Sequence, residues 1–242
     1  MKKHLQAVVA IIAAVCLSSC KMNVLRGSGN KTTISPVVSS FSSINIEIPL
    51  KAEITVKEGA PGVQIKGYEN ILKHIKATVE NNTLTIHYDL DDTWTIHGDD
   101  MSAVITVPSL TGLTLSGAPD ANLHGNITGS DFKLHISGAS DIDIDSINTD
   151  NFTADVSGAA DIKINGGKVN RAVYSLSGAG DIKAFHLQSQ ETSASISGAG
   201  DGQVTALQKL TASISGAGEI KYKGHPTITK NVSGVGELTD AN

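Results

Sequence analysis

The chain has 242 residues, of which 40% are hydrophobic and only 4% aromatic, and its formal net charge is −5 at pH 7. This mildly acidic balance argues against nucleic acid as a partner, because such binding requires a clustered basic surface. The length is sufficient for the core of one large domain.

Residues 1–19 have the pattern of a secretory signal peptide. A basic start, MKK, precedes the apolar run AVVAIIAAV, which is too short to cross a bilayer as a helix. The run ends at Leu17-Ser18-Ser19-Cys20, which resembles the lipobox of bacterial lipoproteins, where the cysteine becomes the acylated first residue. We therefore expect lipidation at Cys20. An ordinary signal peptide with an incidental cysteine is the alternative.

Cleavage at this point would leave Cys20 as the only cysteine, because Cys16 lies in the removed segment, and would exclude an intramolecular disulfide. It would also leave 17 basic residues against 24 acidic ones, a net charge near −7. Residues 20–37 are polar and contain glycine, which predicts a lipidated N-terminus followed by a flexible tether.

Residues 38–242 are expected to form one domain, in which 38–112 is the less regular opening segment. It consists of short stretches in which apolar and polar residues alternate, as is typical of strands, and these stretches are separated by Gly, Asn and Pro. Asn81-Asn82 predicts a hairpin turn. The stretch ENILKHIKATVE (69–80) allows either a short helix or a brief turn. We interpret this segment as opening coils of the same fold as the repeats that follow, with room for one hairpin.

Residues 113–242, the repeat region, carry a pentapeptide of the type SGAGD (177–181) that we call the corner. Its serine recurs at spacings of 21, 20, 20, 20, 18 and 18 residues, at Ser116, Ser137, Ser157, Ser177, Ser197, Ser215 and Ser233. An aliphatic residue precedes each serine, and apolar residues alternate with polar ones on both sides of most corners. This period of two predicts strand, corner, strand.

From this repeat we predict an all-β fold, a single-stranded parallel β-helix with coils of about 18–21 residues. Each coil buries a few side chains at roughly 1.5–3 kcal/mol apiece, which cannot offset backbone ordering of about 1–2 kcal/mol per residue. Stability must therefore come from stacking of coils. The general handedness of strand crossovers favours a right-handed helix.

Two positions of the corner are occupied by one kind of residue throughout. The second is always glycine, which indicates a positive φ or a close approach of neighbouring corners: Gly117, Gly138, Gly158, Gly178, Gly198, Gly216 and Gly234. The fifth is always acidic: Asp120, Asp141, Asp161, Asp181, Asp201, Glu219 and Glu237.

Stacked in register, these acids would lie about 4.8 Å apart. They could form a ladder that binds a hard cation such as calcium. Alternatively, each acid accepts hydrogen bonds from the amides of its own corner, as Asp does in turns. We favour the second interpretation, because serine, glycine and acid recur as a unit and glutamate replaces aspartate in the last two copies.

The segment His87–Asp100 gathers five aspartates, two histidines and the only tryptophan. It does not fit the calcium loop of an EF-hand, because Trp94 stands where the sharp-turn glycine belongs. A ligand-binding loop would use His87, Asp89, Asp91, Trp94 and His97. The plainer interpretation is an acidic loop whose tryptophan packs on the fold.

Several stretches together resemble the bacterial family "putative auto-transporter adhesin, head GIN domain". They are GSGN (27–30), FSSINIEIPLKAEITVKEG (41–59), YENILKHIKATVENNTLTI (68–86), ITVPSLTGLTLSGAPD (105–120) and the corners. The resemblance implies a β-helix-like fold in envelope lipoproteins of Bacteroidetes-type bacteria, and it brings no catalytic residues.

No nucleophile elbow, P-loop, dinucleotide fingerprint or HExxH motif is present in the sequence. We therefore expect a non-enzymatic, lipid-anchored module of the cell envelope, at the outer membrane and on either its periplasmic or its surface face, that acts in binding, adhesion or structure without a cofactor. Its partner would be the membrane, through the lipid, together with an unidentified protein or glycan. The alternatives are a glycan-binding or glycan-active protein, and an adhesive module that uses calcium on the acid ladder.

Overall fold

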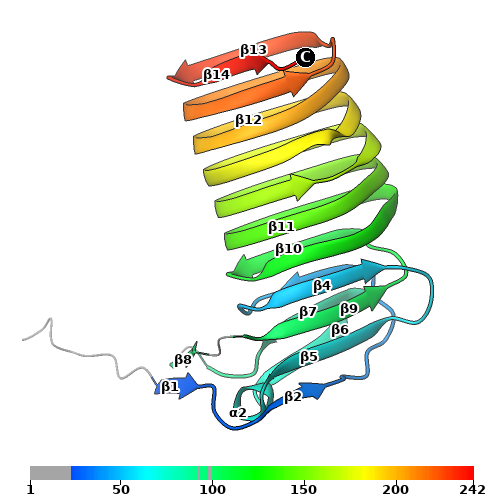
Figure 1. Ribbon diagram of the computed structural model, residues 1–242, viewed down its shortest axis with the longest axis vertical. Helices are drawn as coiled ribbons and strands as arrows, with labels where there is room; N and C mark the ends of the chain where they lie inside the picture. The colour runs from blue at the N-terminus through cyan, green and yellow to red at the C-terminus, as the bar shows by residue number, and fades with distance from the viewer. Residues whose placement is uncertain (1–22, 92, 98–99) are drawn as a thin grey trace, which may run out of the picture.

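The computed structural model describes residues 23–91, 93–97 and 100–242 (Figure 1). The predicted signal peptide and the lipidation site Cys20 lie outside these residues. Within the described ranges, no helix has the length and apolar character that crossing a bilayer requires.

The fold is all-β and contains a short helix, α2 (Glu69–Leu72), between two strands. The strands before the repeat region are β1 (Asn23–Arg26), β2 (Lys31–Ile34), β3 (Ser43–Ile46), β4 (Lys51–Val56), β5 (Gly62–Tyr68), β6 (Ile75–Glu80), β7 (Thr83–Tyr88), β8 (Trp94–His97) and β9 (Ser102–Val107). Those that follow are β10 (Gly112–Gly117), β11 (Asp120–Ile164), β12 (Gly167–Lys223), β13 (Thr227–Gly234) and β14 (Glu237–Asp240).

Twelve of these strands form one sheet that curls into a half-barrel, and β1 and β8 form a separate parallel pair (Figure 1). The order β2-β5-β9-β4-β11-β10-β3-β7-β6 mixes both directions, because β5 is antiparallel to β2 and β9, and β6 is antiparallel to β7. The prediction of a single-stranded, right-handed parallel β-helix is therefore wrong.

The antiparallel strands that rule out a parallel β-helix lie in the opening segment. Asn81 and Asn82 have φ of 48° and 63°, the positive values that a two-residue hairpin turn needs, and this turn sets β6 antiparallel to β7. A repeat spacing shows which residues lie side by side, but it carries no information on strands outside the repeat. The predicted tether also contains structure, because β2 pairs with β5.

Within the repeat region the strands are parallel, and corresponding residues lie in register. The register pairs Ser116 with Ser137, Ser157 with Ser177, and Ser215 with Ser233. β11 and β12 are continuous curled strands of 45 and 57 residues that run through several corners. The chain thus bends at each corner without leaving the sheet.

The glycine at the second corner position has a positive φ in all seven copies, from +85° to +138°. Neighbouring corners also approach closely there. A Cβ added at Gly158 would lie 2.1 Å from the carbonyl oxygen of Gly138, a distance that real Cβ atoms essentially never show. Both a backbone constraint and a packing constraint therefore require glycine at this position.

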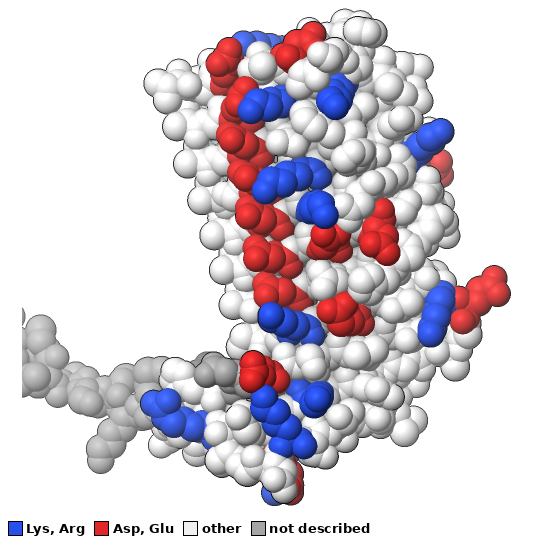
Figure 2. Space-filling model, in the orientation of Figure 1, with Lys and Arg blue, Asp and Glu red and all other residues white. Residues whose placement is uncertain are grey.

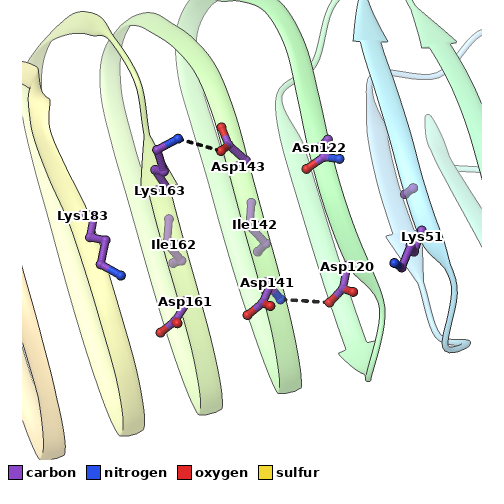
Figure 3. A pocket seen from close by; sticks show the side chains of 11 residues that line it. Lys51, Asp120, Asn122, Asp141, Ile142, Asp143, Asp161, Ile162, Lys163 and Lys183 are labelled. Atoms are coloured by element: carbon purple, nitrogen blue, oxygen red, sulfur yellow. Dashed lines mark hydrogen bonds and ion pairs between the residues drawn. The ribbon is translucent and has the colours of Figure 1, made fainter.

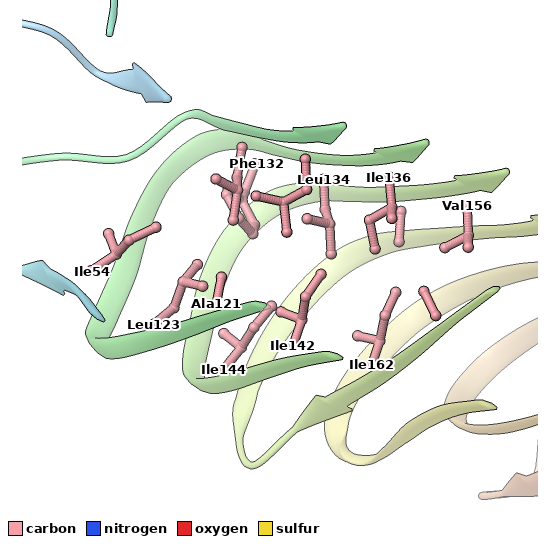
Figure 4. Packing of buried hydrophobic residues seen from close by; sticks show 14 of the residues in the cluster. Ile54, Ala121, Leu123, Phe132, Leu134, Ile136, Ile142, Ile144, Val156 and Ile162 are labelled. Atoms are coloured by element: carbon pink, nitrogen blue, oxygen red, sulfur yellow. The ribbon is translucent and has the colours of Figure 1, made fainter. Parts of the chain in front are cut away.

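The core lies inside the curl, where alternate residues of the long strands β11 and β12 and of most opening strands are buried (Figure 4). Leu134, Ile136 and Ile142 belong to this layer, His135 between the first two is exposed, and Ser140 is a buried polar exception. The rings of Phe132 and Phe152 stack at 5.7 Å between centroids, and Phe152 meets Tyr174 edge to face, also at 5.7 Å. The register sets Ala172 opposite Phe152, so Tyr174, two residues further on, reaches the Phe152 ring diagonally.

The last repeat differs from those before it. Lys230 of β13 lies in register with buried Ala212, at a position that is apolar in the preceding repeats. Most of β13 is exposed, and in the described sheet it pairs with β12 alone. A lysine on an edge strand discourages further strand pairing, so this end of the sheet is blunted.

The close approach of corners leads to a prediction with a matched control. Gly158→Ala should lower the free energy of unfolding by about 2–4 kcal/mol, because it adds a backbone clash to a strained φ. Gly129→Ala should cost only about 1–2 kcal/mol. Gly129 has a similar φ of +142° but no atom within 4 Å of the added Cβ. Denaturant unfolding of both variants measures the difference, and equal losses would show that the clash plays no part.

Candidate functional site

The acidic residues of the corners form a column that crosses the strands along one side of the stacked repeats. Asp120, Asp141 and Asp161 come from successive repeats and lie in line (Figure 3). On the surface, acidic side chains (red) form a nearly continuous stripe along this side, over β11 and β12 (Figure 2). We call the acid at the fifth position of all seven corners the acid column: Asp120, Asp141, Asp161, Asp181, Asp201, Glu219 and Glu237.

Hydrogen bonds explain how like charges tolerate this stacking. At four steps a carboxylate Oδ1 accepts the backbone N–H of the acid one repeat further on: Asp120 from Asp141 (3.1 Å), Asp161 from Asp181 (2.9 Å), Asp181 from Asp201 (3.3 Å) and Asp201 from Glu219 (3.0 Å). The donor thus belongs to the next repeat rather than to the acid's own corner. The column therefore joins successive repeats through side chains as well as through the backbone.

Lysines offset part of the charge. Lys183 Nζ lies 3.5 Å from Asp181 Oδ2, and Lys221 Nζ lies 2.9 Å from Glu219 Oε2. The hydrogen bond from Lys221 is the main reason that the pKa of Glu219 is lowered. Among the residues that the structure describes, no three His, Cys, Asp or Glu side chains are arranged to hold a metal ion.

A shallow groove of about 350 Å³ runs along the lower part of the column (Figure 3). Its charged lining comes from β4, β11 and β12 and consists of Lys51, Asp120, Asp141, Asp143, Asp161, Lys163 and Lys183. Lys163 is paired with Asp143 at 3.0 Å. The groove therefore presents carboxylates and ammonium groups side by side, which suits charged or hydrogen-bonding groups of a partner.

A second polar cluster joins the opening segment to the repeat region. His124 Nε2 lies 2.8 Å from Glu53 Oε2, and His124 Nδ1 lies 3.7 Å from Asp145 Oδ2. The hydrogen bond between His124 and Glu53 raises the pKa of His124 and lowers that of Glu53. Sequence reasoning missed this cluster, because only the pairing of β4 with β11 brings these residues together. No local pattern signals it.

The residues of the predicted ligand loop are only partly brought together. His87, Asp91 and Trp94 line a groove of about 430 Å³ beside β7 and β8. Asp89 instead pairs with Lys76 at 2.7 Å, and His97 lines a different groove. The five residues therefore do not form one cluster.

Two buried polar atoms in residues lining the first of these grooves, His87 Nδ1 and the Tyr88 hydroxyl, have no hydrogen-bond partner in the described structure. Burial raises the pKa of Tyr88 to about 12, so its phenol remains a hydrogen-bond donor at neutral pH. The Asp91 carboxylate is occupied, because it accepts the Thr93 N–H at 3.1 Å and the Thr93 hydroxyl. Among the described residues that line the groove, the acids are Glu47, which accepts the Asn45 side-chain amide, and Asp91, so they form no free pair of acids.

Comparisons with known proteins agree with this architecture. The family model "Putative auto-transporter adhesin, head GIN domain" matches residues 40–226. The solved structure of a putative adhesin from Bacteroides fragilis NCTC 9343 is 26% identical with a TM-score of 0.76, over 90% of this chain and 100% of that one. Among curated proteins, none matches significantly.

Two further solved structures share the fold. A putative adhesin from Parabacteroides merdae ATCC 43184 is 20% identical with a TM-score of 0.72, over 91% of this chain and 100% of that one. A putative lipid binding protein from Parabacteroides distasonis ATCC 8503 is 23% identical with a TM-score of 0.64, also over 91% of this chain and 100% of that one. At these identities the likeness concerns the fold alone.

The hydrogen bonds of the acid column predict how it responds to substitution and to calcium. Asp161→Ala should lower the free energy of unfolding by about 1 kcal/mol, because the Asp181 N–H loses its acceptor. Asp161→Asn should stay within about 0.5 kcal/mol of the wild type, because the amide oxygen still accepts. Asp155→Ala is the control, since the structure gives that exposed carboxylate no hydrogen bond.

The same proteins should show no rise in melting temperature with calcium at millimolar concentration, because four of the seven carboxylates already accept a backbone N–H. A rise in the wild type that Asp161→Asn abolishes would instead support the cation ladder.

The His124–Glu53 pair predicts a pH dependence of stability. The raised pKa of His124 means that its contribution is complete below the ordinary value of 6.5 and is lost as the pH rises through the folded value. The lowered pKa of Glu53 means that its contribution is complete above 4.5 and is lost as the pH falls through the folded value. The pair should therefore stabilise most between these limits.

His124→Gln should accordingly reduce the free energy of unfolding more at about pH 5.5 than at about pH 8. The difference should stay below about 1 kcal/mol, because both side chains are nearly half exposed. Chemical denaturation at the two pH values measures it, and an equal loss at both would contradict the role assigned to the imidazolium.

Proposed function

Since its family model matches residues 40–226, the chain belongs to the "Putative auto-transporter adhesin, head GIN domain" family, and we propose that it is a non-enzymatic, adhesin-like binding module of the bacterial cell envelope. That match is the observation that carries the proposal. The putative adhesin from Bacteroides fragilis, similar along its whole length, supports it. A lipid on Cys20 would hold the module to the outer membrane.

The geometry of the repeat region suits a binding role. Equivalent side chains recur on successive strands about 4.8 Å apart, so an extended partner can make the same contact several times. Such repeated weak contacts add up without a deep pocket. The groove over Asp120, Asp141 and Asp161 presents this pattern to solvent. The partner would be an extended protein segment or a glycan.

The hydrogen bonds within the acid column support a structural role for its carboxylates. Asp120, Asp161, Asp181 and Asp201 each hold the backbone of the next repeat. A hydrolase of the glycosidase type needs two carboxylates that are available for proton transfer or nucleophilic attack. We therefore place binding ahead of catalysis.

The anchor can be tested by fractionating cells that express tagged wild-type or Cys20→Ser protein. The wild type should sediment with membranes, and the variant should remain in the exported, unattached fraction because it cannot be acylated. Thermal unfolding of the two soluble domains should be alike, which serves as the control for folding. Membrane association of the variant would contradict a lipid anchor.

Protease treatment of intact and lysed cells then tests the adhesin-like role. Digestion on intact cells is the expected result, since an adhesin must reach its partner outside the cell. Protection until lysis would overturn adhesion as the function and would place the binding partner in the periplasm.

A further inference from the structure

The pair of strands β1 and β8, which we call the ribbon, is the described structure nearest in sequence to the proposed lipidation site. It is parallel, with Asn23 opposite Trp94 and Arg26 opposite His97. Because the strands are parallel, both begin at the same end of the ribbon. That end is the one at which the chain arrives from Cys20.

The ribbon is fixed to the rest of the fold. Leu25 and Ile96 pack against the hydrophobic core. The side-chain amide of Asn70 donates to the Arg26 carbonyl at 2.7 Å, and its oxygen accepts the Ser28 N–H at 2.9 Å. The position of Asn23 relative to the sheet is therefore defined, and little free chain remains between the fold and Cys20.

Covalent geometry then limits how far the ribbon can stand from the bilayer. Three residue steps separate Asn23 from Cys20, and an extended chain covers at most about 11 Å over that length. The acyl chains of a lipidated cysteine lie in the hydrocarbon layer, and the polar interface outside that layer is about 5–8 Å deep on each side. The start of the ribbon must then lie at, or close to, the lipid headgroups. This step rests on the lipid anchor proposed above.

The side chains at this end suit such a position. Trp94, the only tryptophan, has 39% of its surface exposed, and Val24 has 48% exposed. Tryptophan favours the membrane interface, because its ring is apolar and its N–H can still donate. Trp94 is in register with Asn23, so Trp94 and Val24 lie on opposite faces of the ribbon, both near the end that the chain from Cys20 reaches.

We propose that the ribbon rests on the membrane surface and that Trp94 lies among the lipid headgroups. The partner of this surface is the bilayer that carries the protein's own lipid. The module is then held at a fixed height on its N-terminal end instead of swinging on a flexible tether.

The single tryptophan allows a direct test with the acylated full-length protein. The protein is reconstituted into phospholipid vesicles, with or without doxyl groups near the headgroup end of the acyl chains. Emission from Trp94 should shift to shorter wavelength on vesicles, and doxyl lipids should cause about a twofold loss of emission.

The matched control moves the reporter to the opposite end of the sheet (Figure 1). Ile228 of β13 is also 39% exposed, so the double variant Trp94→Phe, Ile228→Trp places a reporter of similar exposure far from the ribbon. Its emission should not respond to doxyl lipids. Thermal unfolding close to that of the wild type shows that the variant is folded.

The outcomes separate the two proposals. Protein that does not float with vesicles contradicts the lipid anchor, and with it the proposed function. Protein that floats while Trp94 is unquenched, or is quenched no more than the reporter at position 228, overturns the inference about the ribbon and leaves the anchor standing.

Discussion

The corners of successive repeats approach so closely that their backbones nearly touch, and the arrangement of the repeat region depends on this contact. An added Cβ at these glycines would come within 2.0–2.5 Å of the preceding glycine's carbonyl oxygen from Gly138 onward. The contact favours the register in which glycine faces glycine, because a side chain at these positions would clash with the preceding corner. Once the corners are fixed, the inner side chains meet as an aromatic and aliphatic core, and the acids that end each corner meet as a column.

The acid column shows how one constraint produces both stability and surface chemistry. A carboxylate that must stack on another would be repelled by roughly 1 kcal/mol at 4 Å in water. Here the neighbouring N–H and nearby lysines such as Lys183 and Lys221 offset the repulsion. The edge is consequently rigid and polar at the same time. An ordered polar surface of this kind is suited to recognition, because little side-chain freedom is lost when a partner binds.

The sequence predicts the local features of the repeat region well, because they arise from periodicity and turn chemistry. The spacing of the serines matches the observed register, and Asn81-Asn82 predicts the hairpin that joins β6 to β7. Contacts between distant segments are different. Neither the antiparallel pairing of β5 nor the meeting of His124 with Glu53 follows from any local pattern, and the first of these omissions led to the wrong fold class.

The candidate site illustrates the same limit. A cluster of chemistry-bearing residues in sequence, His87–Asp100, becomes several separate environments once the chain folds, because strand pairing sends Asp89 to Lys76 and sets His97 opposite Arg26. The acid column behaves in the opposite way. Its members are about twenty residues apart in sequence and adjacent in space, so regular spacing is the better guide to shared surfaces in this chain.

Lys230 has a consequence for how such a molecule can vary in size. Every repeat before β13 presents an apolar inner position to the next, so an additional repeat placed between two of them would find a matching surface on both sides. β13 carries Lys230 at this position, so the last strand presents a charged side chain instead of an apolar one. The module can therefore be lengthened by insertion between internal repeats, and its length is set by their number.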